Sequence, residues 1–298
     1  MKTNRFSWLI IGVLVGSFLV TGCSEDVEEE PNGPAIIQPT VEFPGTLENW
    51  CSTPFENFSF FVTSITAMWD LSGSDREVML GSGFGGDFKG LAGADSICQH
   101  IAIAVGHGTK RWRAFLSVVD GGEGNPIHAI DRIGSGPWYD ANNRLIANDK
   151  AGLMGIRPDG DPQAIDDLVD ECGIPISSIG DAHDVVTSSN REGKLRSTNP
   201  ESTCMDWTSS DGSVGNPGRM DPNEASAPPD TAVFCGHSFP RQFSPPGREE
   251  NWGKYWMSDH QLRGCGKGGN LLQNGPGVGD CIGCSGGYGA LYCFVADD

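Results

Sequence analysis

The cysteines of this 298-residue chain, ten in number, constrain its fold more than any other residue type, because the N-terminus predicts export. Lys2 and Arg5 precede an apolar run over residues 8–20, and small residues then lead to Cys23, which is the order of a secretory signal. An exported chain can keep disulfide bonds. Ten cysteines less Cys23 leave an odd number, so at least one thiol is free or pairs with another molecule.

The segment Val20-Thr21-Gly22-Cys23 resembles the lipobox of bacterial lipoproteins. The resemblance implies that residues 1–22 are a signal peptide, that Cys23 is acylated, and that lipid anchors the mature protein in a membrane. Ser24 stands where an Asp would resemble an inner-membrane retention signal, which favours the bacterial outer membrane, on its periplasmic face or at the cell surface. The alternative is an uncleaved anchor helix, but the run is shorter than the about 18 apolar residues of a membrane span, and no later stretch reaches that length.

Acidic and turn-forming residues follow the lipobox. Residues 24–30 contain five acids, and Pro and Gly come next, with little periodicity up to about residue 54. We therefore expect a flexible acidic linker over residues 23–54 and one domain over residues 55–298. The net charge is −19, or −21 once Lys2 and Arg5 leave with the signal, which argues against nucleic acid as a partner because phosphates are repelled.

Periodicity within 55–298 predicts an α+β domain. Apolar residues at helical spacing predict a helix from Ala94 to Val105, and alternation predicts a strand over residues 111–119. A second helix is expected over 162–171, where Asp161 can cap the first turn. Between residues 173 and 285, Gly, Pro, Ser, Asn and Asp dominate, and the segments that still look like strands are 184–188, 205–208 and 252–257. Apolar runs at 58–62 and 288–296 are also expected to be strands.

Three parts of the chain resemble endostatin. They are Gly93-Ala94-Asp95-Ser96-Ile97-Cys98 with Trp112-Arg113-Ala114-Phe115-Leu116-Ser117; Val186-Thr187-Ser188-Ser189-Asn190 with Gly193-Lys194 and Cys204-Met205-Asp206-Trp207; and Leu291-Tyr292-Cys293-Phe294. The same signatures occur in a bacterial family of exported lipoproteins of unknown function. The resemblance implies a C-type-lectin-like (endostatin-like) domain, in which a twisted antiparallel sheet carries two helices and long disulfide-braced loops.

The resemblance also implies two disulfide bonds, Cys98–Cys293 and Cys204–Cys284. A third bond, Cys265–Cys281, is our own expectation for a cross-link between loops. The Cys281-Ile282-Gly283-Cys284 segment could instead bind zinc together with Cys265 and His260, but disulfides are favoured in an exported chain. We therefore expect no metal site among these residues.

Aromatic and oxygen-bearing side chains in the long loops are the candidate ligand-binding residues: Trp207, Asn223, Glu224, Trp252, Tyr255, Trp256 and Asp259. Aromatic faces stack on sugar rings and anchor protein interfaces, although core packing would explain the tryptophans equally well. Many lectins of this fold bind sugar through calcium, but their Glu-Pro-Asn and Trp-Asn-Asp motifs are missing here. No cofactor is therefore expected, with calcium the one alternative.

No catalytic group of residues is recognisable. The six histidines lie in no known triad motif, and the nearest local grouping, His183-Asp184 with Ser188, is interpreted as incidental. We expect a lipid-anchored extracytoplasmic binding module, not an enzyme, that presents its loops to a glycan or protein ligand, as in adhesion. The alternatives are a structural envelope-assembly lipoprotein, which the odd thiol could cross-link, and a hydrolase acting on extracellular polymers.

Overall fold

The computed structural model describes residues 34–48, 50–75, 78–216, 230–241, 248–272 and 279–297. The predicted signal segment, Cys23 and the candidate residues Asn223 and Glu224 lie outside these ranges. Within them, no helix combines the length and the apolar character needed to cross a membrane.

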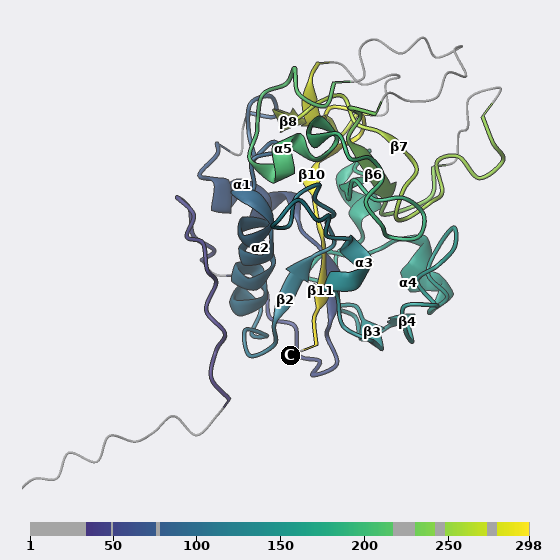
Figure 1. Cartoon of the computed structure of the whole chain (residues 1–298). Coiled ribbons are helices and arrows are strands. Elements are labelled where there is room, and N and C mark those ends of the chain that lie inside the picture. Colours follow the sequence, from purple (N-terminus) through teal and green to yellow (C-terminus); the bar gives the residue numbers. More distant parts are fainter. Residues whose placement is uncertain are drawn as a thin grey trace, which may run out of the picture. The chain divides into compact units, whose positions relative to one another are not determined.

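The chain forms a mixed α+β structure with small sheets (Figure 1). Its helices are α1 (Ile65–Ser72), α2 (Gly90–Ala104), α3 (Ala129–Arg132), α4 (Pro162–Asp166), η1 (Ile176–Ile179), η2 (Pro200–Thr203) and α5 (Cys204–Trp207). The strands are β1 (Phe60–Val62), β2 (Trp112–Ala114), β3 (Trp138–Tyr139), β4 (Leu145–Ala147), β5 (Asp184–Val186), β6 (Phe234–His237), β7 (His260–Gln261), β8 (Gly266–Gly269), β9 (Cys281–Gly283), β10 (Gly287–Ala290) and β11 (Tyr292–Val295).

The first sheet joins the two ends of the domain. Its order is β1-β11-β2, with both pairs antiparallel, so Cys293 lies opposite Phe61 on one side and Ala114 on the other. Helix α2 lies beside β2 and buries the apolar face that the sequence predicts, including Ile97 and Cys98 (Figure 1). The predicted helix is thus confirmed, and strands form near residues 60, 112 and 292, but β2 covers only Trp112–Ala114 of the strand predicted over residues 111–119.

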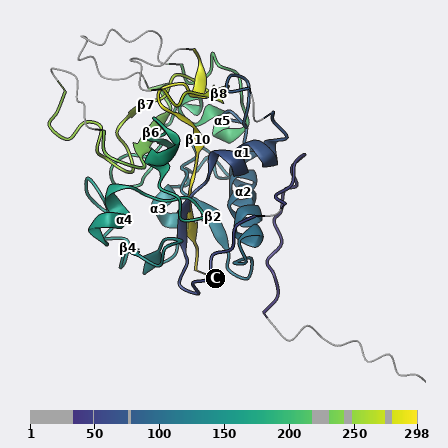
Figure 2. The same ribbon diagram turned by 180° about the vertical axis from the view of Figure 1, so that it is seen from behind.

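A second, four-stranded sheet has the order β10-β5-β6-β7. Strands β5, β6 and β7 are antiparallel neighbours, whereas β10 runs parallel to β5. In both Figure 1 and Figure 2, β6 and β7 lie away from α2. This sheet carries the candidate site described below.

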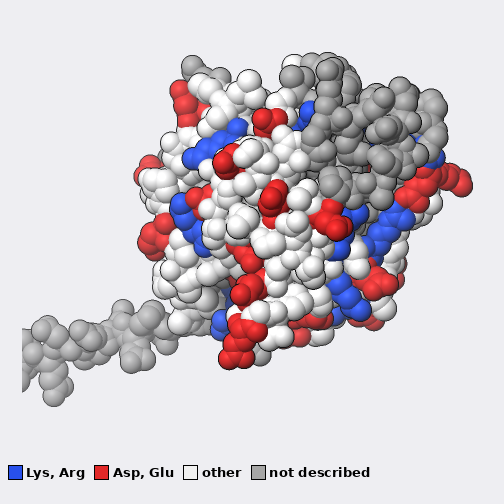
Figure 3. Space-filling view, turned by 45° about the horizontal axis from the view of Figure 1, so that its top comes forward, with Lys and Arg blue, Asp and Glu red and all other residues white. Residues whose placement is uncertain are grey.

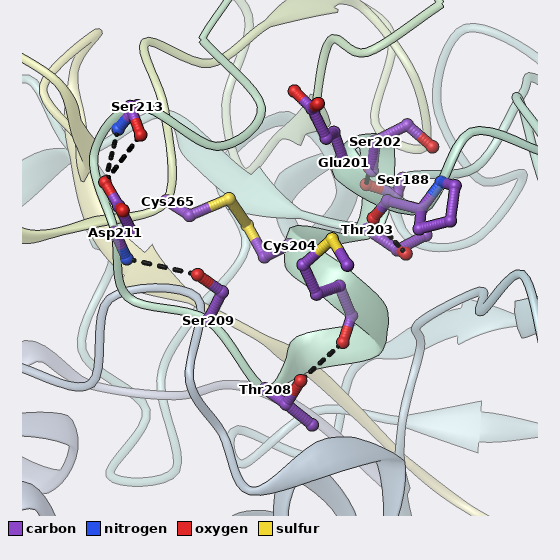
Figure 4. The surroundings of a disulfide bond; sticks show 12 residues. Ser188, Glu201, Ser202, Thr203, Cys204, Thr208, Ser209, Asp211, Ser213 and Cys265 are labelled. Carbon is purple, nitrogen blue, oxygen red and sulfur yellow. Dashed lines mark hydrogen bonds between the residues drawn. A yellow bond between two sulfur atoms is a disulfide. The ribbon is translucent and has the colours of Figure 1, made fainter.

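Four disulfide bonds brace the described residues: Cys51–Cys172, Cys98–Cys293, Cys204–Cys265 and Cys281–Cys284. The expected bond between α2 and the final strand is confirmed. The expected Cys204–Cys284 and Cys265–Cys281 pairings are wrong, because Cys281 and Cys284 close on each other across one turn, with Cα atoms 5.0 Å apart. Cys204 forms its disulfide with Cys265 instead (Figure 4).

The segment 205–208 is not the expected strand. Residues 204–207 all have positive φ, between 50° and 64°, so α5 is a left-handed turn. Such backbone is costly for residues with side chains and persists only where its surroundings hold it. Here the Cys204–Cys265 bond holds one end, and buried Trp207 donates a hydrogen bond to the Ser117 carbonyl at 3.0 Å. The segment 252–257 also forms turns and not a strand.

The second predicted helix is present but shorter than expected. Asp161 caps α4 and accepts a hydrogen bond from the Gln163 N–H at 2.8 Å, as predicted. The helix ends at Asp166 because the residues that follow have other partners: the Leu168 N–H donates to the Ser238 carbonyl, and the Val169 carbonyl accepts from β1. Tertiary pairing therefore overrides the helical pattern.

Two residues of the expected linker over residues 23–54, Ile37 and Thr40, make hydrogen bonds to the domain. The Ile37 N–H donates to the Gly108 carbonyl at 2.8 Å, and the Ser96 hydroxyl of α2 accepts from the Thr40 N–H at 3.1 Å. Part of the expected linker is thus packed against the domain. The acidic run that motivated the expectation lies outside the described residues.

Candidate metal centre and adjoining groove

Three neighbouring strands bring together three imidazoles and one carboxylate. Asp184 begins β5 and pairs with His237, the last residue of β6, while His260 begins β7. His183 precedes Asp184 directly. One potential ligand atom from each of these four residues lies within 4.8 Å of all the others. We call His183, Asp184, His237 and His260 the histidine cluster.

The spacing within the histidine cluster matches a metal coordination shell. The Nε2 atoms of His183, His260 and His237 lie 3.1, 3.2 and 3.6 Å from Asp184 Oδ1. In a tetrahedral zinc site with bonds of about 2.0–2.1 Å, neighbouring ligand atoms are about 3.3 Å apart. The three distances to Asp184 Oδ1 are close to this value, and no two of the four ligand atoms are more than 4.8 Å apart, so the cluster can surround one ion once the imidazoles move closer together.

Each imidazole is oriented by a hydrogen bond at its other nitrogen. Nδ1 of His183 lies 2.6 Å from Asp181 Oδ1, Nδ1 of His237 lies 2.7 Å from the Gly253 carbonyl, and Nδ1 of His260 lies 3.0 Å from the Gln261 carbonyl. These partners are acceptors, so each Nδ1 carries the proton and each Nε2 faces the centre of the cluster. Metal-binding histidines are held in the same way in known sites.

Among the described residues, three buried polar atoms of the cluster have no hydrogen-bond partner: Nε2 of His183, Nε2 of His237 and Oδ2 of Asp184. The two imidazole nitrogens lie 3.1 and 3.6 Å from Asp184 Oδ1, so each forms an ion pair with the carboxylate when its ring is protonated. The side chains of His183 and His237 are 0% exposed and that of Asp184 is 1% exposed. Unpartnered polar atoms at such depth are destabilising, which points to a ligand that would satisfy them.

The charged groups of the cluster shift one another's pKa values. Burial alone would raise the pKa of Asp184, but the neighbouring His183 and His260 hold it well below its usual range. Burial alone would lower the pKa of His260, yet Asp184 raises it to about 9. His183 also has a raised pKa, because Asp184 and Asp181 outweigh its burial. Burial, together with the charges of His183 and His260, lowers the pKa of His237 well below its usual value.

Cys235 is the unpaired cysteine of the described residues, and it lies beside the cluster. Its thiol is completely buried and donates to Asp184 Oδ1 at 3.3 Å. Burial and the nearby Asp184 raise the pKa of this thiol well above its usual value. A buried, protonated thiol cannot form a disulfide with another molecule. Cys235 therefore does not support the alternative of a cross-linked envelope-assembly protein.

A groove of about 620 Å³ lies beside the cluster. His260, 11% exposed, contributes to its lining, and Trp252 stacks on the His260 ring with centroids 5.7 Å apart. The other lining residues are mainly charged or polar: Asn190, Arg191, Glu192, Arg196, Phe234, Arg248, Glu249, Ser258, Asp259 and Gln261. On the molecular face in Figure 3, acidic and basic side chains are likewise interspersed.

The predicted ligand-binding residues divide into two groups. Trp207 and Trp256 are completely buried in the core, and Trp256 donates to the Leu153 carbonyl, so neither can contact a ligand. Trp252 and Asp259 line the groove, and Tyr255 supports Arg191 there. The Asp259 carboxylate accepts hydrogen bonds from the Gly253 and Tyr255 N–H groups, so it shapes the loop beside the groove.

Sequence reasoning missed the histidine cluster. From the sequence, the grouping of His183-Asp184 with Ser188 is interpreted as incidental. In the structure, His183 and Asp184 belong to the cluster, whereas Ser188 lies outside it and its hydroxyl donates to the Ser202 carbonyl. The zinc alternative with Cys265, Cys281 and Cys284 is wrong, because all three cysteines form disulfides and only His260 joins the cluster. The sequence offers one signal, His183 directly before the predicted strand 184–188. The strands that hold His237 and His260 were not predicted, and the sequence separations of the three histidines follow no known motif.

Comparison of the sequence with protein-family models and with curated proteins finds no match.

Proposed function

We propose that this chain is a lipid-anchored extracytoplasmic binding module that presents the groove to a glycan or protein ligand. The observation that carries the proposal is the groove itself, which is formed by the long loops and lined by arginine–aromatic pairs. The lipobox-like segment ending at Cys23 supports export and lipid attachment, with the outer membrane as the destination. The α+β architecture and the Cys98–Cys293 bond support a C-type-lectin-like, endostatin-like fold.

The arginine–aromatic pairs make the groove suitable for binding. The Arg191 guanidinium lies 3.4 Å from the Tyr255 ring centroid, and that of Arg196 lies 3.5 Å from the Phe234 centroid. Stacking restricts these side chains before a ligand arrives, which lowers the entropy cost of binding. Half-buried Trp252 adds an aromatic surface on which a sugar ring or an apolar side chain can pack.

The test is an array of glycans and envelope or matrix proteins probed with the full-length chain in detergent. We expect at least one reproducible ligand, whose affinity falls about tenfold in Trp252→Ala, a typical loss for an interface aromatic. Phe55→Ala removes an exposed aromatic that does not line the groove and should leave the affinity unchanged. Absence of any ligand, or equal losses in both variants, would count against the proposal.

A hydrolase is the second candidate, because histidines and the carboxylates of Asp181 and Asp184 lie close to the groove. The burial of the cluster argues against it, since His183, Asp184 and His237 are not accessible to a substrate. An exposed base or nucleophile is needed for such chemistry.

A further inference from the structure

We propose that His183, Asp184, His237 and His260 bind one Zn²⁺ ion in a closed structural site. This inference goes beyond the proposed binding function and does not depend on it. The ion would join β5, β6 and β7 through side chains that are up to 77 residues apart in the sequence (183 to 260).

The ion accounts for features of the cluster that protein contacts leave unexplained. It would coordinate the two buried imidazole nitrogens that have no hydrogen-bond partner among the described residues, Nε2 of His183 and Nε2 of His237. It would also use the inward orientation of all three Nε2 atoms, which the hydrogen bonds at Nδ1 impose. A salt-bridge network alone would account for His183 and His260, which lie 3.1 and 3.2 Å from Asp184 Oδ1, but it leaves the buried Nε2 of His237 without a hydrogen-bond partner among the described residues.

The donor set favours zinc over calcium or magnesium. Three of the four donors are imidazole nitrogens and one is a carboxylate oxygen. Calcium takes six to eight oxygen ligands and magnesium demands oxygen donors in octahedral geometry, so neither fits. Four nitrogen and oxygen ligands at tetrahedral spacing are typical of Zn²⁺.

The site is closed, which indicates a structural role. All four positions of a tetrahedral ion are filled by protein, whereas catalytic zinc keeps one position for water or substrate. Trp252 stacks on His260, the one ligand that reaches the groove.

The position of the cluster also suits a structural ion. Among the four described disulfides, none has a cysteine in β5, β6 or β7, although long loops enter and leave these strands. A zinc ion would supply the cross-link that the second sheet lacks.

The first test is the metal content and stability of the full-length chain, purified in detergent without a metal-affinity tag. We expect about one zinc per chain, and after removal by chelator we expect ZnCl₂ to restore a higher melting temperature, whereas CaCl₂ does not. Titration with Co²⁺ should give the visible absorption of a tetrahedral site, a readout that needs no variant. A chain that binds neither ion, or that CaCl₂ stabilises equally, would overturn the inference.

Variants locate the ion. His237→Ala should lose the zinc, while His100→Gln, an imidazole outside the cluster, should keep it. Asp181→Asn weakens the partner of a ligand without removing a donor, so zinc affinity should fall about 10–100-fold. Cys235→Ser should retain zinc, and its loss there would show that the donor set is wrong. Full zinc content in His237→Ala would also contradict the assignment.

Discussion

Gly286 determines where the imidazole of His183 can lie. Its φ is +133°, and a Cβ atom built on it would lie 2.2 Å from Cε1 of His183. Such a contact cannot be accommodated without moving the ring, and positive φ is itself unfavourable for residues with a Cβ. We therefore expect Gly286→Ala to displace His183 and to lower zinc affinity at least tenfold, as other changes around metal ligands do.

Zinc titration of the purified Gly286→Ala variant measures this effect. Gly122 is a suitable control, since its φ is +124° but a Cβ there meets no atom within 4 Å. Gly122→Ala shares the backbone cost and should keep the zinc affinity. Equal affinity in both variants would show that the ring of His183 is not held by this contact.

Residue identity alone could not predict this site. The sequence shows that His183 and Asp184 are adjacent, but His237 and His260 lie in the later strands β6 and β7, and the number of residues between these strands carries no information about register. The strand register, Asp184 opposite His237, creates the cluster. By contrast, the buried face of α2 follows from the local spacing of its apolar residues, and Ile97 and Cys98 on that face are 0% exposed.

At the scale of elements, helix α1 depends on a buried carboxylate. Glu171 accepts hydrogen bonds from the Ser64 hydroxyl at 2.6 Å and the Ser64 N–H at 2.9 Å, at the N-cap of α1. Burial, with Asp170 nearby, raises the pKa of Glu171 to about 7, and burial raises that of Asp170 to about 6. The folded state therefore keeps protons that the unfolded chain releases.

Stability should accordingly fall as the pH rises from about 4.5 to about 7, because the unfolded state binds fewer protons over that interval. Glu171→Gln keeps an acceptor for Ser64 but cannot ionise. The change in its unfolding free energy with pH should therefore be smaller than in the wild type, by at least the roughly 1.4 kcal/mol that one pKa unit represents. Urea unfolding at about pH 5 and about pH 8 measures the difference. The exposed Glu48→Gln should behave as the wild type, and an unchanged slope in Glu171→Gln would contradict the account.

Elements with local signals were predictable and those with tertiary causes were not. The apolar repeat of α2 and the Asp161 cap of α4 can be recognised from residues that are close together in the sequence. The early end of α4 and the left-handed turn at residues 204–207 are imposed by β1, Ser238 and Cys265, which are remote in sequence. The same reason explains why two disulfide pairings were wrong.

For the whole molecule, the Cys98–Cys293 bond is the longest-range cross-link of the described residues, with its two cysteines 195 positions apart in the sequence. Removing it frees a large loop in the unfolded state, which costs roughly 5 kcal/mol of stability in the chain-entropy model. Opening Cys281–Cys284, separated by 3 residues, should cost only about 2 kcal/mol by the same relation.

Urea unfolding of the two double-alanine variants compares these losses directly. Both pairs are buried, so differences in side-chain burial do not decide the order. The Cys98→Ala/Cys293→Ala variant should be the less stable of the two. The reverse order would mean that the bond joining α2 to the final strand is not what holds the two ends of the domain together.

In the zinc-loaded chain, we infer that β5, β6 and β7 meet around one zinc ion. X-ray diffraction from crystals of the zinc-loaded chain, recorded on both sides of the zinc absorption edge, tests it most directly. The account predicts one anomalous peak bonded to His183, Asp184, His237 and His260 at about 2.0–2.2 Å. A peak elsewhere on the molecule, or imidazoles that turn away from Asp184 with no peak between them, would contradict it.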